Sequence, residues 1–254
     1  ALLRGTTSTS TAKLAVRQKV AGGSFTPLPD ISTSLLPHLA PGTGAASLVI
    51  GPSDQLHLVY HFCNLTASEP PSRSTPRYHL LAGTGWSDHK TVDNQTVDGL
   101  SGFSPRLVLS GNRKYAAYFF HKAGQVGVPT ADLRLATWVL DADLPSVEIL
   151  DQGIPSEDPM YPAYRVAMAV DKFGLIHLAI IRPSPGNIGT LEYRRQMRDA
   201  SGNVKWLSDI VDDNVLAGNA NGRVDMIVDD KARPHIAYLS GVDLKVRYAT
   251  RYDR

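Results

Sequence analysis

The stretch RVAMAVDKFGLIHLAI, residues 165–180, is followed 58 residues later by RVDMIVDDKARPHIAY, residues 223–238. The two stretches share Arg, Val, Met, Val, Asp, His and Ala at matching positions. Similarity within one chain at a fixed spacing is the signature of a repeat architecture, in which each repeat is one packing unit. The chain therefore contains a repeated unit, and the recurring His helps to locate its other copies.

Further copies of the unit lie earlier in the chain. One position of the unit recurs in four stretches, SDQLHLVY, GNRKYAAY, FGLIHLAI and ARPHIAY. The residues at this position are His57, Tyr115, His177 and His235, at spacings of 58, 62 and 58 residues. In the second copy Tyr replaces His and the preceding turn is shorter. Each copy begins with an apolar segment and continues into a third alternating segment, and three copies add a fourth, such as GWSDHKTVD.

These segments have the character of β-strands. They are short, rich in Val, Ile, Leu and Tyr, alternate with a period of two, and are bounded by Gly, Pro, Asn and Asp. No capped amphipathic helix of ten or more residues stands out, and 21 Gly and 17 Pro interrupt the chain every few positions. Repeated units of four antiparallel strands are typical of β-propeller blades, which must stack because one blade cannot bury both of its faces. We therefore predict an all-β protein, a β-propeller of four-stranded antiparallel blades.

The repeats predict four to five blades in one propeller domain over residues 1–254. Full blades are expected at residues 45–98, 104–152 and 161–213, with partial blades at residues 12–31 and 222–253. Because a free sheet edge invites aggregation, residues 13–31 are expected to pair with the blade that contains His235, or a second chain is expected to supply the missing strands. The ring is either small with irregular closure or part of a larger one.

The pattern VDKFGLIHLAI, GTLEYRRQ and GNVKWLSDIVD resembles the bacterial β-propeller repeats that read His-Ile-Ala-Tyr, then Leu-Tyr-Ala, then Trp. The resemblance covers most of residues 45–253. It implies that the first strand of each blade lines a central channel and that the long loops at residues 62–77, 119–132, 151–164 and 181–189 open on one face. It does not specify a function, because propellers include lectins, hydrolases, lyases and scaffolds.

Composition excludes several classes of function. The net charge is +2 with acids and bases interspersed, so no nucleic-acid-binding surface is expected. The apolar runs are too short for a membrane-spanning helix. The lone Cys63 rules out a disulfide within the chain and is expected to be a buried thiol. No catalytic or phosphate-binding motif occurs, and no cofactor is expected.

The recurring His residues, His57, His177 and His235, raise the question of a metal site. One equivalent position per blade spaces them around the ring, whereas metal ligands must converge on one ion. We therefore expect no metal site and interpret these imidazoles as donors to the backbone that stabilise each blade. The three Trp residues admit sugar stacking, but we expect them to fill the wedges between blades: Trp86, Trp138 and Trp206.

Arginine opens the first strand of three successive units, as Arg106, Arg165 and Arg223. The resemblance to propellers places these side chains near the channel mouth, where converging guanidiniums could hold a carboxylate, sulfate or phosphate. The alternative is structural, with each Arg paired to an Asp of a neighbouring blade.

Other candidate residues lie in or beside the long loops. His61, His121 and Tyr161, together with an Arg, could perform the proton abstraction of a polysaccharide lyase. Carboxylates for glycoside hydrolysis could come from different blades, and the loop candidates are Glu69, Glu157 and Asp158. The alternative for each is an ordinary solvated loop residue.

Two functions are consistent with these features. The first is a binding or interaction module that recognises a glycan or protein partner through the loop face, favoured by regular repeats without a catalytic motif. The alternative is a polysaccharide-degrading enzyme, a lyase or glycoside hydrolase, that acts on an acidic glycan at the channel mouth. A purely structural part of a larger assembly is a third possibility. An extracellular or cell-surface location is expected.

Overall fold

The computed structural model describes residues 13–14, 17–19, 23–28, 31–32, 46–63, 73–82, 85–88, 90–93, 99–122, 130–139, 144–155, 165–184, 186, 188–217 and 223–251, and the following applies to these residues. Their regular elements are all β-strands, as predicted. Among them no helix is long and apolar enough to cross a membrane.

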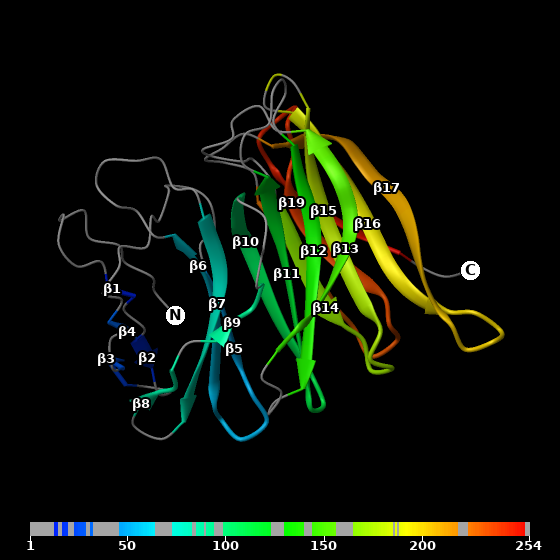
Figure 1. The fold of residues 1–254 in the computed structure, drawn as a ribbon. Helices are drawn as coiled ribbons and strands as arrows, with labels where there is room; N and C mark the ends of the chain where they lie inside the picture. Colours follow the sequence, from blue (N-terminus) through cyan, green and yellow to red (C-terminus); the bar gives the residue numbers. More distant parts are fainter. Residues whose placement is uncertain are drawn as a thin grey trace.

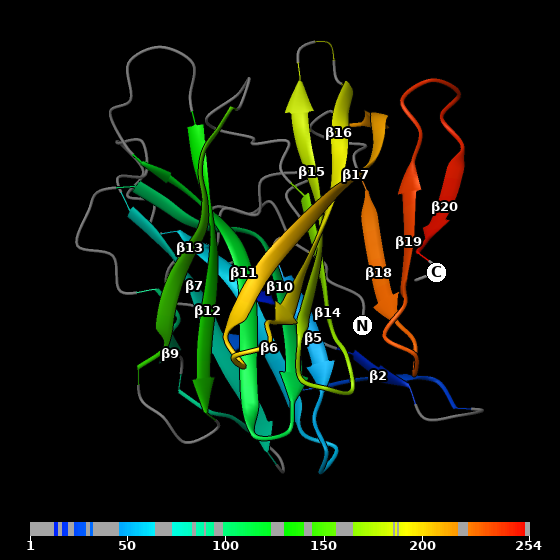
Figure 2. The ribbon, with the colours of Figure 1, turned by 90° about the vertical axis from the view of Figure 1, so that its right-hand side faces the viewer.

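The strands form a four-bladed β-propeller of antiparallel blades (Figures 1 and 2). A short parallel pairing, of Gly99 with Arg73 and Leu100 with Ser74, joins the first two blades into one sheet. Blade 1 consists of β5 (Ala46–Ile50), β6 (Leu56–Cys63), β7 (Arg73–Ala82), β8 (Gly85–Trp86) and β9 (Lys90–Thr91). Blade 2 consists of β10 (Gly99–Ser110), β11 (Arg113–Lys122), β12 (Thr130–Val139) and β13 (Ser146–Pro155). Blade 3 consists of β14 (Arg165–Val170), β15 (Ile176–Ser184), β16 (Ile188–Arg198) and β17 (Val204–Leu216). Blade 4 consists of β18 (Val224–Val228), β19 (Pro234–Leu239) and β20 (Val246–Thr250).

The repeated Asp forms the turn between the first and second strands. In blade 3 the Asp171 carboxylate accepts hydrogen bonds from the backbone N–H groups of Phe173, at 2.8 Å, and Leu175, at 2.9 Å. In blade 4 the Asp229 carboxylate makes the same two bonds, to residues 231 and 233. A short side-chain acceptor that bonds the backbone two residues on is the usual means of fixing such a turn. The repetition of Asp therefore reflects repeated turn geometry.

The repeated His connects three parts of blade 3. The Nδ1 atom of His177 lies 2.6 Å from the Tyr193 hydroxyl on the third strand, and its Nε2 lies 3.3 Å from the carboxylate of Asp171. Because Nε2–H donates to the carboxylate, Nδ1 accepts from the Tyr hydroxyl. The predicted stabilising role is supported, but the expected backbone partner is wrong, since the partners are side chains.

The same connection recurs with different surroundings. In blade 4 His235 contacts Tyr248 through Nδ1 and Asp229 through Nε2. In blade 1 the Nδ1 atom of His57 lies 2.7 Å from the Tyr78 hydroxyl, but Gly51 stands where the other two blades have Asp. The repeated His is thus a structural residue of the blade.

The core lies between adjacent blades. Apolar residues from facing sheets form one buried cluster between blades 1 and 2, one between blades 2 and 3, and one between blades 3 and 4. Trp138 is buried in the first of these, Trp206 packs against the second, and Trp86 packs beside Leu58 and Tyr60 on blade 1. The expectation that the Trp residues fill the wedges between blades is confirmed for Trp138 and Trp206, whereas Trp86 packs against residues of its own blade.

Blade 4 has one covered face and one exposed face. Leu191 and Tyr193 of blade 3 are 0% and 3% exposed, because blade 4 covers them. Their counterparts on blade 4, Val246 and Tyr248, are 74% and 61% exposed. The two positions that contact the next blade in blade 3 are therefore open to solvent in blade 4.

The N-terminal strands form a hairpin of their own. β2 (Arg17–Lys19) pairs with β3 (Phe25–Pro27), and β1 (Lys13–Leu14) pairs with β4 (Ile31–Ser32) in nearly continuous register (Figure 1). The expected pairing with the blade of His235 is wrong for the described residues, whose strands pair with each other.

The two copies of the His–Tyr bond provide a matched test of burial. Tyr193→Phe removes the partner of a buried imidazole nitrogen and should lower the free energy of unfolding by about 1–3 kcal/mol. Tyr248→Phe removes the same bond at an exposed site and should cost less than about 1 kcal/mol. Urea unfolding of both variants measures the two changes in the free energy of unfolding. Equal losses of stability would contradict the difference in burial between the Tyr193 and Tyr248 sites.

The His57 imidazole should remain uncharged in the folded protein at pH values well below 7. Burial, followed by the positive charge of Lys114, lowers the pKa of the His57 imidazole from 6.5 to about 4. A folded-state pKa below the unfolded one means that the stability contribution is complete above pH 6.5 and is lost as the pH falls toward 4. An NMR titration of the imidazole resonances tests this. A midpoint for His57 near 6.5 would show that the site is not desolvated as described.

Candidate functional site

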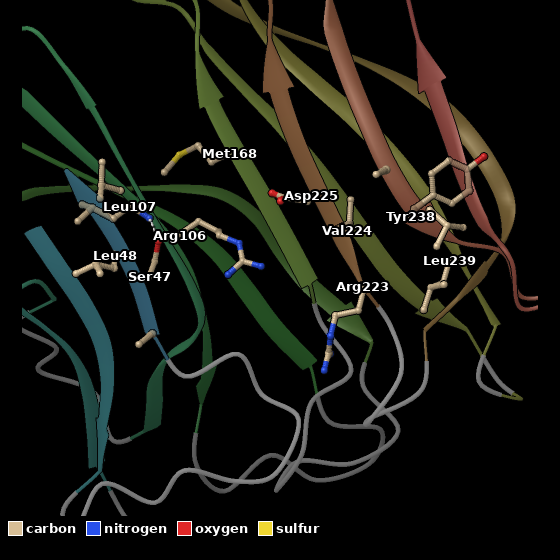
Figure 3. A pocket seen from close by; sticks show the side chains of 14 residues that line it. Ser47, Leu48, Arg106, Leu107, Met168, Arg223, Val224, Asp225, Tyr238 and Leu239 are labelled. Carbon is tan, nitrogen blue, oxygen red and sulfur yellow. Dashed lines mark hydrogen bonds between the residues drawn. The ribbon is translucent and has the colours of Figure 1, made fainter. Parts of the chain in front are cut away.

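A cavity of about 580 Å³ lies where the first strands of the blades meet (Figure 3). We call it the axial cavity, because β5, β10, β14 and β18 each contribute to its lining. Its lining residues are Ala46, Ser47, Leu48, Val49, Arg106, Leu107, Met168, Arg223, Val224, Asp225, Ala237, Tyr238, Leu239 and Val246. The cavity thus lies between blade 1 and the exposed face of blade 4.

Two of the three predicted arginines, Arg106 and Arg223, line this cavity, whereas Arg165 is not among its described lining residues. Arg165 is the first residue of β14, Arg223 directly precedes β18, and Arg106 lies within β10. β10 contacts β14, and β14 contacts β18, so the first strands of successive blades lie side by side around the axis. In register, Arg106 corresponds to Asp225 of blade 4 and not to Arg223. Figure 3 shows the Arg106 side chain extending from the wall that contains Ser47 and Leu107 into the cavity, while the Arg223 side chain points away from Asp225.

An irregularity in β10 precedes Arg106. The pairing of β10 with β11 shifts register between Phe103 and Arg106, and Ser104 within this interval has a positive φ of 48°. A bulge bends a strand and changes the direction of the side chains that follow it. The Nη1 of Arg165 lies 3.5 Å from the Ser104 hydroxyl, so the bulge also contacts the next blade. Sequence reasoning missed Ser104, and its only signal was the following Pro105.

The arginines interact electrostatically as a group. Burial, and after it the positive charges of Arg223 and Arg106, lowers the pKa of the Arg165 guanidinium to about 10. Burial also lowers the pKa of Arg106, while Asp225 opposes that shift and Arg223 adds to it. The guanidiniums of Arg106 and Arg165 thus lie in the positive potential of Arg223, in surroundings poorer in water than the surface.

Asp225 is the carboxylate among the described lining residues. It lies two residues after Arg223 on β18 and is exposed to the cavity. Its attraction for Arg106 joins blade 4 to blade 2, two blades that are not neighbours in the ring. The attraction acts across the channel. The alternative that each Arg pairs with an Asp of a neighbouring blade stays a prediction.

Apolar side chains form the remaining walls. Leu48 and Val49 line one side from β5, and Ala237, Leu239 and Val246 line the other from blade 4. Ligand sites in proteins are typically such concave surfaces, mostly apolar with a few convergent polar groups. The axial cavity combines a charged end with apolar walls.

The other candidate residues are not gathered at the axial cavity. His61 lies near the end of β6 opposite Pro76, and His121 lies near the end of β11 opposite Leu100. Both imidazoles are buried, and neither is among the described lining residues of the axial cavity. Tyr161, Glu69, Glu157 and Asp158 lie outside the described residues, so their roles stay predictions.

A second cavity, of about 460 Å³, lies at the periphery between blades 3 and 4. Its charged lining residues, Asp209 and Arg251, form an ion pair with each other. The structure shows no cluster of three or more His, Cys, Asp or Glu side chains suited to a metal ion within its described ranges. The axial cavity is therefore the stronger candidate site.

No protein-family model matches the chain, and no curated protein sequence matches it. Solved structures do match it. An α-L-arabinanase from Penicillium chrysogenum, complexed with arabinobiose, has a TM-score of 0.53 at 12% sequence identity, over 94% of this chain and 70% of the arabinanase. An ulvan lyase from a new family of polysaccharide lyases has a TM-score of 0.45 at 12% identity, over 98% of this chain and 73% of the lyase. At this identity, the arabinanase match shows a shared fold.

The pairing of Arg106 with Asp225 can be measured by a double-mutant cycle. Removing one partner leaves the other charge without compensation across the channel, so Arg106→Gln and Asp225→Asn should be coupled by about 0.5–2 kcal/mol in urea unfolding. The coupling should weaken as salt is added. Independent effects of the two substitutions at low ionic strength would contradict an interaction between these side chains.

Proposed function

We propose that this protein is a glycan-recognition module that binds its ligand in the axial cavity. The observation that carries the proposal is the convergence of Arg106, Arg223 and Asp225 at a concave site with apolar walls. Sugar hydroxyls both donate and accept hydrogen bonds, and guanidinium and carboxylate groups side by side meet both needs. The C–H faces of a sugar ring fit the apolar walls. An extracellular or cell-surface location accords with this role.

The arabinanase offers independent support. It shares the propeller fold with this chain, and its structure was solved with arabinobiose. The propeller fold can thus hold a short oligosaccharide. Since folds host many functions, this likeness supports the class of ligand only when taken with the cavity.

The second candidate function is an enzyme that degrades a polysaccharide, and the arabinanase match favours it. Hydrolysis of a glycosidic bond normally needs two carboxyl groups. Asp225 is the carboxylate in the described lining, so a second would have to come from elsewhere, such as the candidates Glu69, Glu157 or Asp158. The arabinanase match supports this candidate at least as well as recognition, and the two are separated by the turnover assay below.

Ligand binding can be tested with a glycan array followed by calorimetric titration of the strongest ligand. Ala237→Trp places a large side chain in the cavity wall and should weaken binding at least tenfold. Ile227→Trp is the matched control, because Ile227 is exposed on the same blade but is not among the described lining residues. Thermal unfolding of both variants checks that they fold.

Binding that survives Ala237→Trp, or failure of every glycan to bind, would contradict the proposal. The enzyme alternative is tested on the same ligands by release of reducing ends and by absorbance of unsaturated uronates. If the protein cleaves a ligand and Ala237→Trp abolishes the cleavage, catalysis takes place at the axial cavity. Degradation then replaces recognition as the proposed function.

A further inference from the structure

We infer that the exposed face of blade 4 extends the axial cavity into a groove for an oligosaccharide, in which the ring of Tyr248 is a stacking platform for a second sugar unit. The inference rests on the proposed function and adds the length of glycan that the site recognises. Three observations carry it: a row of residues that leads from the cavity to Tyr248, the exposure of this tyrosine, and a carboxylate on the same face.

Tyr248 adjoins the wall of the axial cavity. Ala237 on β19 lies opposite Asp225 on β18 and opposite Tyr248 on β20, so the three residues form a row across neighbouring strands (Figure 2). Because neighbouring strands lie about 4.8 Å apart, the row is about 10 Å long. Asp225 and Ala237 line the cavity, as does Val246, which lies two residues before Tyr248 and therefore on the same face. A ligand that leaves the cavity along this row next meets the Tyr248 ring.

Tyr248 is exposed at a position where the equivalent tyrosine of blade 3 is covered. Tyr193 makes the same bond to its His and is 3% exposed, because blade 4 packs on it. Tyr248 is 61% exposed, while its hydroxyl contacts Nδ1 of His235. This bond holds the ring in place, so little side-chain freedom is lost when a ligand packs on it. An exposed and fixed aromatic ring is suited to stack on the C–H face of a sugar.

The carboxylate on this face favours a glycan over another β-sheet. The residues that correspond to the row in blade 3 are Ala167, Ala179 and Tyr193, and blade 4 covers them. Asp225 thus stands where the covered blade has Ala167, and a sheet packed on it would enclose its carboxylate away from water, which is costly. Arg106, at the same position of blade 2, has a long side chain that extends into the cavity past the covering blade. A sugar instead offers hydroxyl groups that donate to the carboxylate and an apolar face that packs on the ring.

The decisive experiment measures affinity against the length of the saccharide. Calorimetric titrations use the mono-, di-, tri- and tetrasaccharides of the arabinose series and the cellulose series, and the same lengths of any further glycan that binds on the array. The affinity should rise about tenfold or more between the monosaccharide and the trisaccharide, because the added units gain the contact with the Tyr248 ring.

Variants at Tyr248 locate the second subsite. Tyr248→Leu removes the ring and should weaken binding of the trisaccharide about tenfold, while binding of the monosaccharide changes less than about twofold. Tyr248→Phe keeps the ring and should retain most of the affinity. Phe173→Leu is the matched control, because Phe173 is 65% exposed in the turn between β14 and β15 and is not among the described lining residues. Thermal unfolding checks that each variant folds.

The outcomes separate this inference from the proposed function. If all lengths bind equally, or if Tyr248→Leu has no effect on the trisaccharide, the stacking platform is wrong and glycan recognition in the axial cavity stands. Equal losses in Tyr248→Phe and Tyr248→Leu would also overturn the platform, because the hydroxyl and not the ring would then carry the binding. If no saccharide of any series binds, glycan recognition is wrong and the platform with it. A wild-type dimer that Tyr248→Leu dissociates in analytical ultracentrifugation would show that a second copy covers this face, and would overturn the inference.

Discussion

The structure depends on one packing constraint: a blade of this chain has two apolar faces and can bury them only against other blades. Met168 and Leu178 of blade 3 pack toward blade 2, while Ile181 and Leu191 pack toward blade 4. Burial of apolar surface is the dominant favourable contribution to folding, so the sheets must stack side by side. Stacking around an axis brings the first strands of different blades together, and the axial cavity is a direct consequence.

The same constraint gives one sequence motif two environments. The His–Tyr–Asp connection is fully enclosed in blade 3, where blade 4 covers it, and half-open in blade 4. Its chemistry is the same in both, which indicates a structural role in tying the second and third strands to the turn. A residue type repeated once per blade thus reports packing.

The fold could be predicted from sequence because its signal is local and repeated. The period of His57, His177 and His235 and the alternation of the strands were sufficient for the architecture. The arginines could be predicted to meet only through the resemblance to propellers. Asp225 and the bulge at Ser104 could not be found, because the partner across the channel and the register shift depend on how distant strands pack. Tyr161 remains a prediction.

The most direct test of the account is a crystal structure of the protein with an oligosaccharide that it binds. We expect the sugar in the axial cavity, with hydroxyl groups within hydrogen-bonding distance of Arg106 and Asp225. The account would be contradicted by a sugar bound elsewhere, such as the peripheral cavity beside Asp209.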